Sequence, residues 1–226
     1  LLSVQSLDLN QQKLTLSDGE SDLEIQNLLE IDHANEGLIT GDADLKLKQG
    51  ISISAGEVIS TAGTVAIKGA SSLSSGTLSV SSGTLALGGS FEKNGGTLSF
   101  SDSSFTLLDN LSWTSDSLLE IKTLELDNFS LTLGSASSDL KIINPLILDH
   151  EEEKLISGEA DLKFSGLLNI SLGELSSSNG KIQLEQGVVL SGGKLTVPNS
   201  TLEIGNQFNK SGGSANLAGA SLQLYS

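Results

Sequence analysis

The chain of 226 residues lacks three residue types entirely: cysteine, methionine and arginine. Without cysteine it forms no disulfide bond and offers no thiolate ligand to a metal ion. Exported bacterial proteins commonly avoid cysteine because an oxidising exterior would cross-link it, so this absence favours a secreted or cell-surface protein. Aromatic residues make up only 4% of the chain and hydrophobic residues 37%. A compact globular core normally uses more large side chains, so this composition disfavours one.

The charge is one-sided, because 12 lysines face 28 acidic residues and leave a formal net charge of −16. Such a chain repels phosphate backbones and anionic lipids, which excludes nucleic acid as a partner. No run approaches the roughly 18 apolar residues that cross a bilayer, so we expect no membrane insertion. The chain opens at Leu1 in mid-pattern, without the features of a secretion signal. We therefore expect a segment of a longer protein, with flanking repeats beyond both ends.

An internal repeat dominates the sequence. A shift of 117 residues aligns the chain with itself without a gap, and 43 of the 109 comparable positions are identical. Ala43–Lys46 then falls on Ala160–Lys163. We interpret residues 1–117 and 118–226 as tandem copies, and a repeat of this kind is typical of solenoids and arrays.

A shorter rhythm runs inside each copy, made of three-residue groups with apolar first and third positions, mostly 6 to 9 residues apart. Examples are Leu14–Leu16, Leu23–Ile25, Leu29–Ile31, Leu45–Leu47, Ile51–Ile53, Val65–Ile67 and Leu78–Val80. Such alternation predicts short strands with one buried face. Gly-Gly, Ser-Gly and Asn-Gly pairs between the groups mark turns. We also expect Asn27 and Asn144, at sharp corners, to adopt the left-handed conformation.

Strands this short are stable only when they stack on copies of themselves. Three strands of about seven residues each make a coil of about 20 residues, with neighbouring coils paired in parallel. We therefore predict an all-β protein, a right-handed parallel β-helix (a three-sided β-solenoid) of about 11–12 coils. The prediction treats residues 1–226 as a single continuous solenoid. Its narrow interior suits aliphatic rows, and we expect Trp113 to fill the core or a coil end instead of stacking on a sugar.

The chain's only histidines are His33 and His150, and each follows an aspartate, Asp32 or Asp149. An Asp-His pair can act as a general acid and base or bind a metal. The alternative is a polar corner of the coil, and we favour it because no third group is evident. We therefore predict no catalytic residues and no cofactor.

Acidic clusters raise the question of calcium, which prefers oxygen ligands. The candidates are Asp42 and Asp44 in the first copy and Glu159 and Asp161 in the second. However, neither the glycine-rich nine-residue calcium repeat nor a helix-loop-helix ligand pattern occurs. A solvated anionic surface that keeps a repetitive protein soluble is the favoured interpretation.

Polysaccharide-acting β-helix enzymes have the predicted architecture. The lyases among them resemble a β-helix with a calcium groove and a basic catalytic residue, usually arginine, which this chain lacks. The hydrolases need paired carboxylates and usually aromatic platforms, which Trp113 and Tyr225 do not make. We therefore expect that the protein is not an enzyme, and keep a polysaccharide-acting enzyme as an alternative.

The segments Gly88–Leu98 (GGSFEKNGGTL) and Gly205–Gly213 (GNQFNKSGG) look like repeats of very large bacterial surface proteins. The whole chain resembles filamentous haemagglutinin-like and autotransporter-passenger adhesins at the level of pattern. This resemblance implies a structural or adhesive stalk segment of a secreted or bacterial cell-surface protein. Host, cell-surface or glycan ligands are then the expected partners. The second alternative is a subunit of an extracellular fibre or sheath that self-associates end to end.

Overall fold

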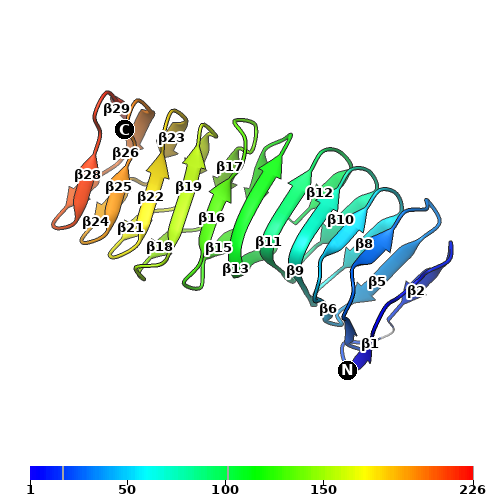
Figure 1. The fold of residues 1–226 in the computed structure, drawn as a ribbon. Helices are drawn as coiled ribbons and strands as arrows, with labels where there is room; N and C mark the ends of the chain where they lie inside the picture. Colours follow the sequence, from blue (N-terminus) through cyan, green and yellow to red (C-terminus); the bar gives the residue numbers. More distant parts are fainter. Residues whose placement is uncertain (17, 101, 226) are drawn as a thin grey trace. The chain divides into compact units, whose positions relative to one another are not determined.

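In the computed structural model, which describes residues 1–16, 18–100 and 102–225, every regular element is a β-strand (Figure 1). Within this described part, no helix is long and apolar enough to cross a membrane. The chain divides into two compact units, Leu1–Asp109 and Asn110–Ser226. Together they contain about 11 turns of parallel β-solenoid, which confirms the predicted all-β coil architecture.

The strands of the first unit stack in three columns, one for each side of the coil. The first column contains β1 (Leu2–Val4), β3 (Leu23–Ile25), β6 (Leu45–Leu47), β9 (Thr64–Leu73) and β11 (Thr84–Lys93). The second contains β4 (Leu29–Ile31), β7 (Ile51–Ile53) and the later halves of β9 and β11. The third contains β2 (Lys13–Thr15), β5 (Gly37–Gly41), β8 (Glu57–Ser60), β10 (Thr77–Val80) and β12 (Thr97–Ser99).

The second unit also has three columns. One contains β13 (Ser104–Ser115, whose first residues belong to the first unit), β16 (Ser130–Leu133), β19 (Lys154–Gly158), β22 (Glu174–Ser177), β25 (Lys194–Thr196) and β28 (Ser214–Asn216). Another contains β14 (Leu119–Ile121), β17 (Leu140–Ile142), β20 (Leu162–Phe164), β23 (Lys181–Leu184), β26 (Thr201–Gly205) and β29 (Ser221–Tyr225). The third contains β18 (Leu146–Leu148), β21 (Leu168–Ile170), β24 (Val188–Leu190) and β27 (Phe208–Lys210), while β15 (Thr123–Glu125) pairs with β13.

Parallel register gives the length of each coil directly. Val65 pairs with Leu85, so this coil has the regular spacing of about 20 residues. Leu23 pairs with Leu45, so the coil between them is two residues longer. The two extra residues lie between β4 and β5, where residues 32–36 form the connection; between β7 and β8 the connection is only residues 54–56. One corner of the solenoid is therefore longer than the corner stacked above it.

The 117-residue repeat holds at the level of strand register inside each unit. Leu140 pairs with Leu162 in the second unit as Leu23 pairs with Leu45 in the first. The register shift between Ile39 and Gly41 of β5 recurs between Ile156 and Gly158 of β19. Even the irregularities are therefore encoded by the repeated sequence.

The core of each unit consists of inward-facing aliphatic ladders. The inward positions of β3, β6 and β9, such as Leu23, Leu45 and Val65, are fully buried. Fully burying one such side chain stabilises the fold by about 1.5–3 kcal/mol. The core also takes aromatic rings: Trp113 and Phe105 are completely buried. Trp113 is thus a core residue, as expected, although the interior holds more than aliphatic rows.

Candidate functional site

The two Asp-His pairs lie in the lengthened corners of the two units. Residues 32–36 join β4 to β5, and residues 149–153 join β18 to β19. Each corner has the sequence Asp-His-x-x-Glu, and the glutamate at its end, Glu36 or Glu153, is buried. Because the connection is two residues longer than its neighbour, its backbone N–H groups need partners that the stacked coils do not supply.

The buried glutamate supplies those partners. Glu36 Oε2 accepts the backbone N–H groups of Asp32 (2.9 Å) and His33 (3.3 Å). Its other oxygen accepts the N–H of Gln11, from the coil beneath, at 3.2 Å. The bond from the Asp32 N–H is the largest of the effects that lower the pKa of Glu36. In the second unit, Glu153 Oε2 accepts the N–H groups of Asp149 (2.8 Å) and His150 (3.2 Å).

The imidazoles also form hydrogen bonds within their own corners. His33 Nδ1 accepts the backbone N–H of Asn35, and His150 Nδ1 accepts that of Glu152, both at 3.3 Å. Each imidazole therefore uses one ring nitrogen to hold the backbone of its own corner. The structure thus joins the glutamate and histidine side chains to backbone N–H groups of the same corner, to which the aspartate contributes its own N–H.

The glycine of the next coil closes over this corner. Gly56 adopts φ +62°, and a side-chain carbon there would lie 2.5 Å from the carbonyl oxygen of Glu36 and 2.7 Å from that of His33. Gly173 occupies the same position in the second unit, with φ +50° and the Glu153 oxygen at 2.7 Å. Only glycine combines this conformation with so close an approach. The glycine of the next coil therefore packs directly against the backbone of the corner.

The calcium candidates lie at other corners and also bond to the backbone. Asp44 Oδ1 accepts the N–H of Thr64 at 2.8 Å, and Asp161 Oδ1 accepts the N–H of Lys181 at 2.7 Å. Asp42 Oδ1 accepts the hydroxyl of Thr61 at 3.1 Å. Glu159 is exposed. Among the residues that the structure describes, no three His, Asp or Glu side chains lie close enough to hold a metal together.

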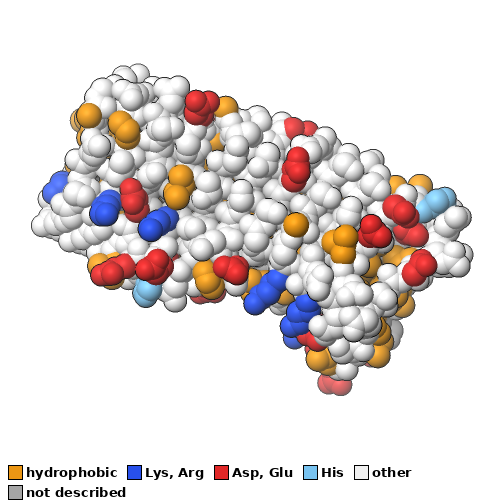
Figure 2. Space-filling model, viewed as in Figure 1, with side chains coloured by type: hydrophobic (Ala, Val, Ile, Leu, Met, Phe, Trp, Pro, Cys, Tyr) orange, Lys and Arg blue, Asp and Glu red, His pale blue; other side chains and the backbone are white. Residues whose placement is uncertain are grey.

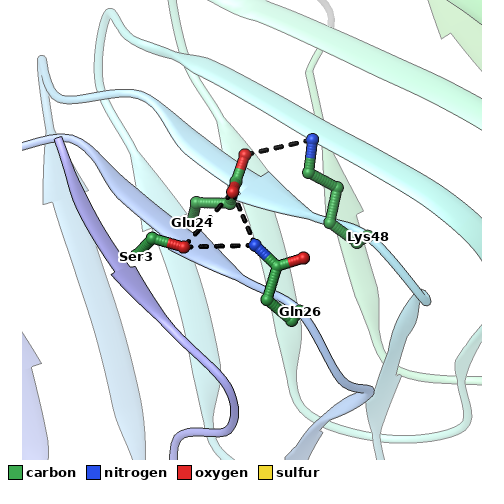
Figure 3. Close-up of polar contacts among 4 residues, drawn as sticks. All are labelled: Ser3, Glu24, Gln26 and Lys48. Carbon is green, nitrogen blue, oxygen red and sulfur yellow. Dashed lines mark hydrogen bonds and ion pairs between the residues drawn. The ribbon is translucent and has the colours of Figure 1, made fainter.

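Charged side chains on the outer faces link successive coils. Figure 3 shows Glu24 of β3 with Lys48 at 3.0 Å, Gln26 at 2.6 Å and Ser3 at 3.3 Å. The hydrogen bond from Lys48 is the main reason that the pKa of Glu24 is lowered. In the second unit the ion pairs are Lys141–Glu120 (2.8 Å), Lys163–Glu185 (2.8 Å) and Lys181–Glu203 (2.9 Å). Figure 2 shows the charged side chains dispersed over the visible face, without a single-sign patch.

A shallow groove of about 550 Å³ lies beside the corner of the second unit. Glu151, Glu152 and Lys154 form one wall, and the glycine turns of the following coils, with Lys194, form the other. The groove combines both signs of charge, while the buried Glu153 and the His150 Nδ1 atom are occupied by backbone bonds. Its outward-facing residues, which include Glu174, can contact a polar partner.

Sequence reasoning singled out Asp32, His33 and their copies but missed the backbone-binding role of Glu36 and Glu153. One signal could have found them: glutamate is retained in both copies, while the two residues before it change from Ala34-Asn35 to Glu151-Glu152. A residue that is identical in the two copies, next to positions that differ, indicates a structural or chemical role. No family model, curated protein or solved structure matches this chain.

Proposed function

We propose that this chain is a structural and adhesive stalk segment of a large secreted or cell-surface bacterial repeat protein, without catalytic activity. One observation carries the proposal. In both units, the side chains best suited to chemistry, His33 with Glu36 and His150 with Glu153, are engaged in holding the same lengthened corner. The same side chains make the same backbone bonds in both copies, which supports a structural role for them.

The solenoid suits a mechanical role because each coil contacts only its neighbours, so length grows by duplication without redesign of the core. The 117-residue repeat is such a duplication at the level of register. Ion pairs between successive coils add lateral links along the outer faces. Such exposed pairs contribute only about 0–1 kcal/mol each, so the aliphatic ladders supply most of the resistance to unfolding.

The adhesive part of the proposal concerns the outer faces. Short polar side chains, mixed charges and the groove beside residues 149–153 form a surface that suits glycan or cell-surface ligands more than nucleic acid. Flanking repeats of the same protein are the expected partners at the coil ends. The resemblance to bacterial surface adhesins supports this assignment at the level of pattern.

Small-angle scattering of two proteins tests the stalk function: the 226-residue chain, and the chain lengthened by a further 117-residue copy. We expect the maximum dimension to grow in proportion to the added coils, by about 4.8 Å per coil. An unchanged dimension would contradict a stalk. Turnover of acidic polysaccharides that disappears in a His33→Ala/His150→Ala double variant would instead support the alternative of an enzyme.

A further inference from the structure

Two corners of the solenoid contain the sequence Asn-Gly, at Asn94-Gly95 in the first unit and at Asn179-Gly180 in the second. In such a pair the backbone nitrogen of the glycine can attack the side-chain amide carbon of the asparagine, because glycine has no side chain to hinder the approach. Ammonia leaves and a cyclic succinimide forms, which water opens to aspartate or isoaspartate. In a folded protein, this reaction depends on how firmly the glycine N–H is held.

The two Asn-Gly pairs lie in closely similar surroundings. Asn94 directly follows β11, Asn179 lies just after β22, and both asparagines are exposed. The backbone N–H of each asparagine donates to a carbonyl oxygen of the preceding coil, at 3.0 and 3.2 Å respectively. A side-chain carbon would lie 2.3 Å from a carbonyl oxygen of that coil at Gly95, and 2.2 Å at Gly180. Exposure of the asparagine and packing of the glycine therefore do not distinguish the two pairs.

The pairs differ at the nitrogen that would attack. Gly180 is buried and its N–H donates to Ser177 Oγ at 3.2 Å, while that hydroxyl donates to the carbonyl oxygen of Gly158 at 3.1 Å. Gly95 is only partly buried, and no group in the described part of the chain accepts its N–H. The attacking nitrogen must lose its proton and turn toward the asparagine side chain. At Gly180 this first requires a buried hydrogen bond to open, whereas at Gly95 it does not.

The side-chain amide of Asn94 is not firmly held either. Its Nδ2 donates to Glu92 Oε1 at 2.7 Å, but both side chains are exposed, so water competes for this bond. Once the amide has become a carboxylate, it no longer donates and faces the Glu92 carboxylate with the same charge. Each modification therefore removes this hydrogen bond and adds one negative charge to the corner.

We propose that Asn94 is a site of spontaneous modification in the folded protein, converted through a succinimide to aspartate and isoaspartate, whereas Asn179 is protected. The Gly95 nitrogen bonds to Cγ of Asn94, and the proton of the glycine N–H leaves with the amide nitrogen as ammonia. A water molecule then adds across one of the two C–N bonds of the ring. Water is the only co-reactant. Isoaspartate carries the chain through Cγ, so its backbone is one carbon longer, and the site lies at a corner of the coil. The inference does not depend on the proposed stalk function.

Ageing of the purified 226-residue chain, folded and in urea, tests the proposal. Mass spectrometry of proteolytic peptides gives the fraction of each asparagine converted to acid over time. In urea the two pairs should convert at comparable rates, because the chain is unfolded at both. Folding should then slow the conversion of Asn179 at least about tenfold more than that of Asn94, because only Gly180 has a bonded N–H. Equal slowing of the two pairs, or stronger slowing at Asn94, would overturn the proposal.

Two variants test the cause. Ser177→Ala removes the acceptor of the Gly180 N–H and should speed the conversion of Asn179 about tenfold in the folded protein, without changing its rate in urea. Asn94→Ser is the matched control, because Ser74 holds the same place in the preceding coil and its N–H makes the same bond. This variant should form no acid at residue 94 and leave Asn179 unchanged.

Hydrogen exchange of the amides around residue 177 separates release of the Gly180 N–H from a general loosening of the Ser177→Ala protein. If those amides stay protected and Asn179 still converts at the parent rate, the Ser177 bond is not the cause of protection and the proposal fails. If the variant is loosened throughout, the comparison of the two pairs in the parent chain decides the question, since it needs no substitution.

Discussion

The two lengthened corners differ in their solvent-exposed residues but make the same hydrogen bonds to the backbone. Residues 32–36 and 149–153 share their aspartate, histidine and glutamate, and in both the glutamate accepts the first two N–H groups of the corner. The residues between change from Ala34-Asn35 to Glu151-Glu152. Duplication has thus preserved the internal support of the corner and altered its outer surface, which is where a difference in binding between the units can arise.

Replacing the glycine above each corner should have the largest effect on this shared geometry. Gly56→Ala forces a left-handed alanine against two carbonyl oxygens, at 2.5 and 2.7 Å, and should lower the free energy of unfolding by about 3 kcal/mol. Gly173→Ala meets its nearest oxygens at 2.7 and 3.0 Å and should cost about 2 kcal/mol. Urea unfolding measures both. An equal decrease in the free energy of unfolding in the two variants would show that both corners are packed in the same way.

Gly158→Ala is the matched control for this pair. Gly158 has φ +59°, like Gly56, but a side-chain carbon there would lie 3.9 Å from its nearest neighbour. It should therefore cost only the conformational term, about 1 kcal/mol. A loss as large as that of Gly56→Ala would mean that conformation alone, and not contact with the corner, decides the effect.

Removing the buried glutamate should cause the next largest loss of stability. Glu36→Ala leaves three N–H groups without their acceptor and should cost about 2–3 kcal/mol. Glu153→Ala removes the acceptor of the Asp149 and His150 N–H groups and should cost about 2 kcal/mol. Glutamine at either position keeps a neutral acceptor and should recover part of the loss. Hydrogen exchange of the corner amides measures the effect locally, and unchanged protection in Glu36→Ala would contradict the assigned role.

Acid should weaken the first corner. The pKa of Glu36 is lowered from 4.5 in the folded protein, so its stabilising effect is complete above about pH 4.5 and is lost as the pH falls through the lowered value. The pKa values of Asp18, Glu24 and Glu185 are also lowered, so the wild-type protein loses stability from several groups. Glu36→Gln should therefore reduce, without abolishing, the loss of stability below pH 4.5. An identical acid profile in this variant would exclude Glu36 as a contributor.

The histidines should matter least. His33→Ala and His150→Ala each remove the acceptor of one partly solvated N–H group, which water can replace, so we expect losses below about 1 kcal/mol. Differential scanning calorimetry of the two variants checks this. A much larger loss from one of them would reveal an interaction that distinguishes the two units.

The strand positions were predictable because inward-facing residues at every second position produce an alternation of apolar and polar residues in the sequence. Leu23–Ile25 and Leu45–Leu47 are strands β3 and β6, as the alternation indicates. The length of β9 was not predictable in this way. Its ladder runs from Thr64 to Leu73 through a corner at Gly69, because that glycine, at φ +93°, turns the chain without interrupting the pairing with β11.

The corners were predicted less well than the strands. Asn27 and Asn144 do not have positive φ, so the expected left-handed conformation is wrong. Their side chains instead bond to the preceding coil: Asn27 Oδ1 accepts from Gln5 and Asn144 Nδ2 donates to Thr123, each at 2.9 Å. Glu36 was missed for a related reason. Local sequence shows which residues tolerate a turn, whereas the burial of Glu36 and its bond to the Gln11 N–H in the coil beneath depend on the stacking of the coils.

The two extra residues of the 32–36 connection show where the solenoid tolerates a change in length. The coil that contains them is longer than the coil that follows, yet the register returns at once to the regular spacing, as the pairing of Leu45 with Val65 shows. Length changes are thus absorbed at a corner, whereas a one-residue change inside a strand would turn every following side chain to the opposite face. Corners are the sites at which this scaffold can accept inserted loops, natural or designed, without a change in the pairing register of its strands.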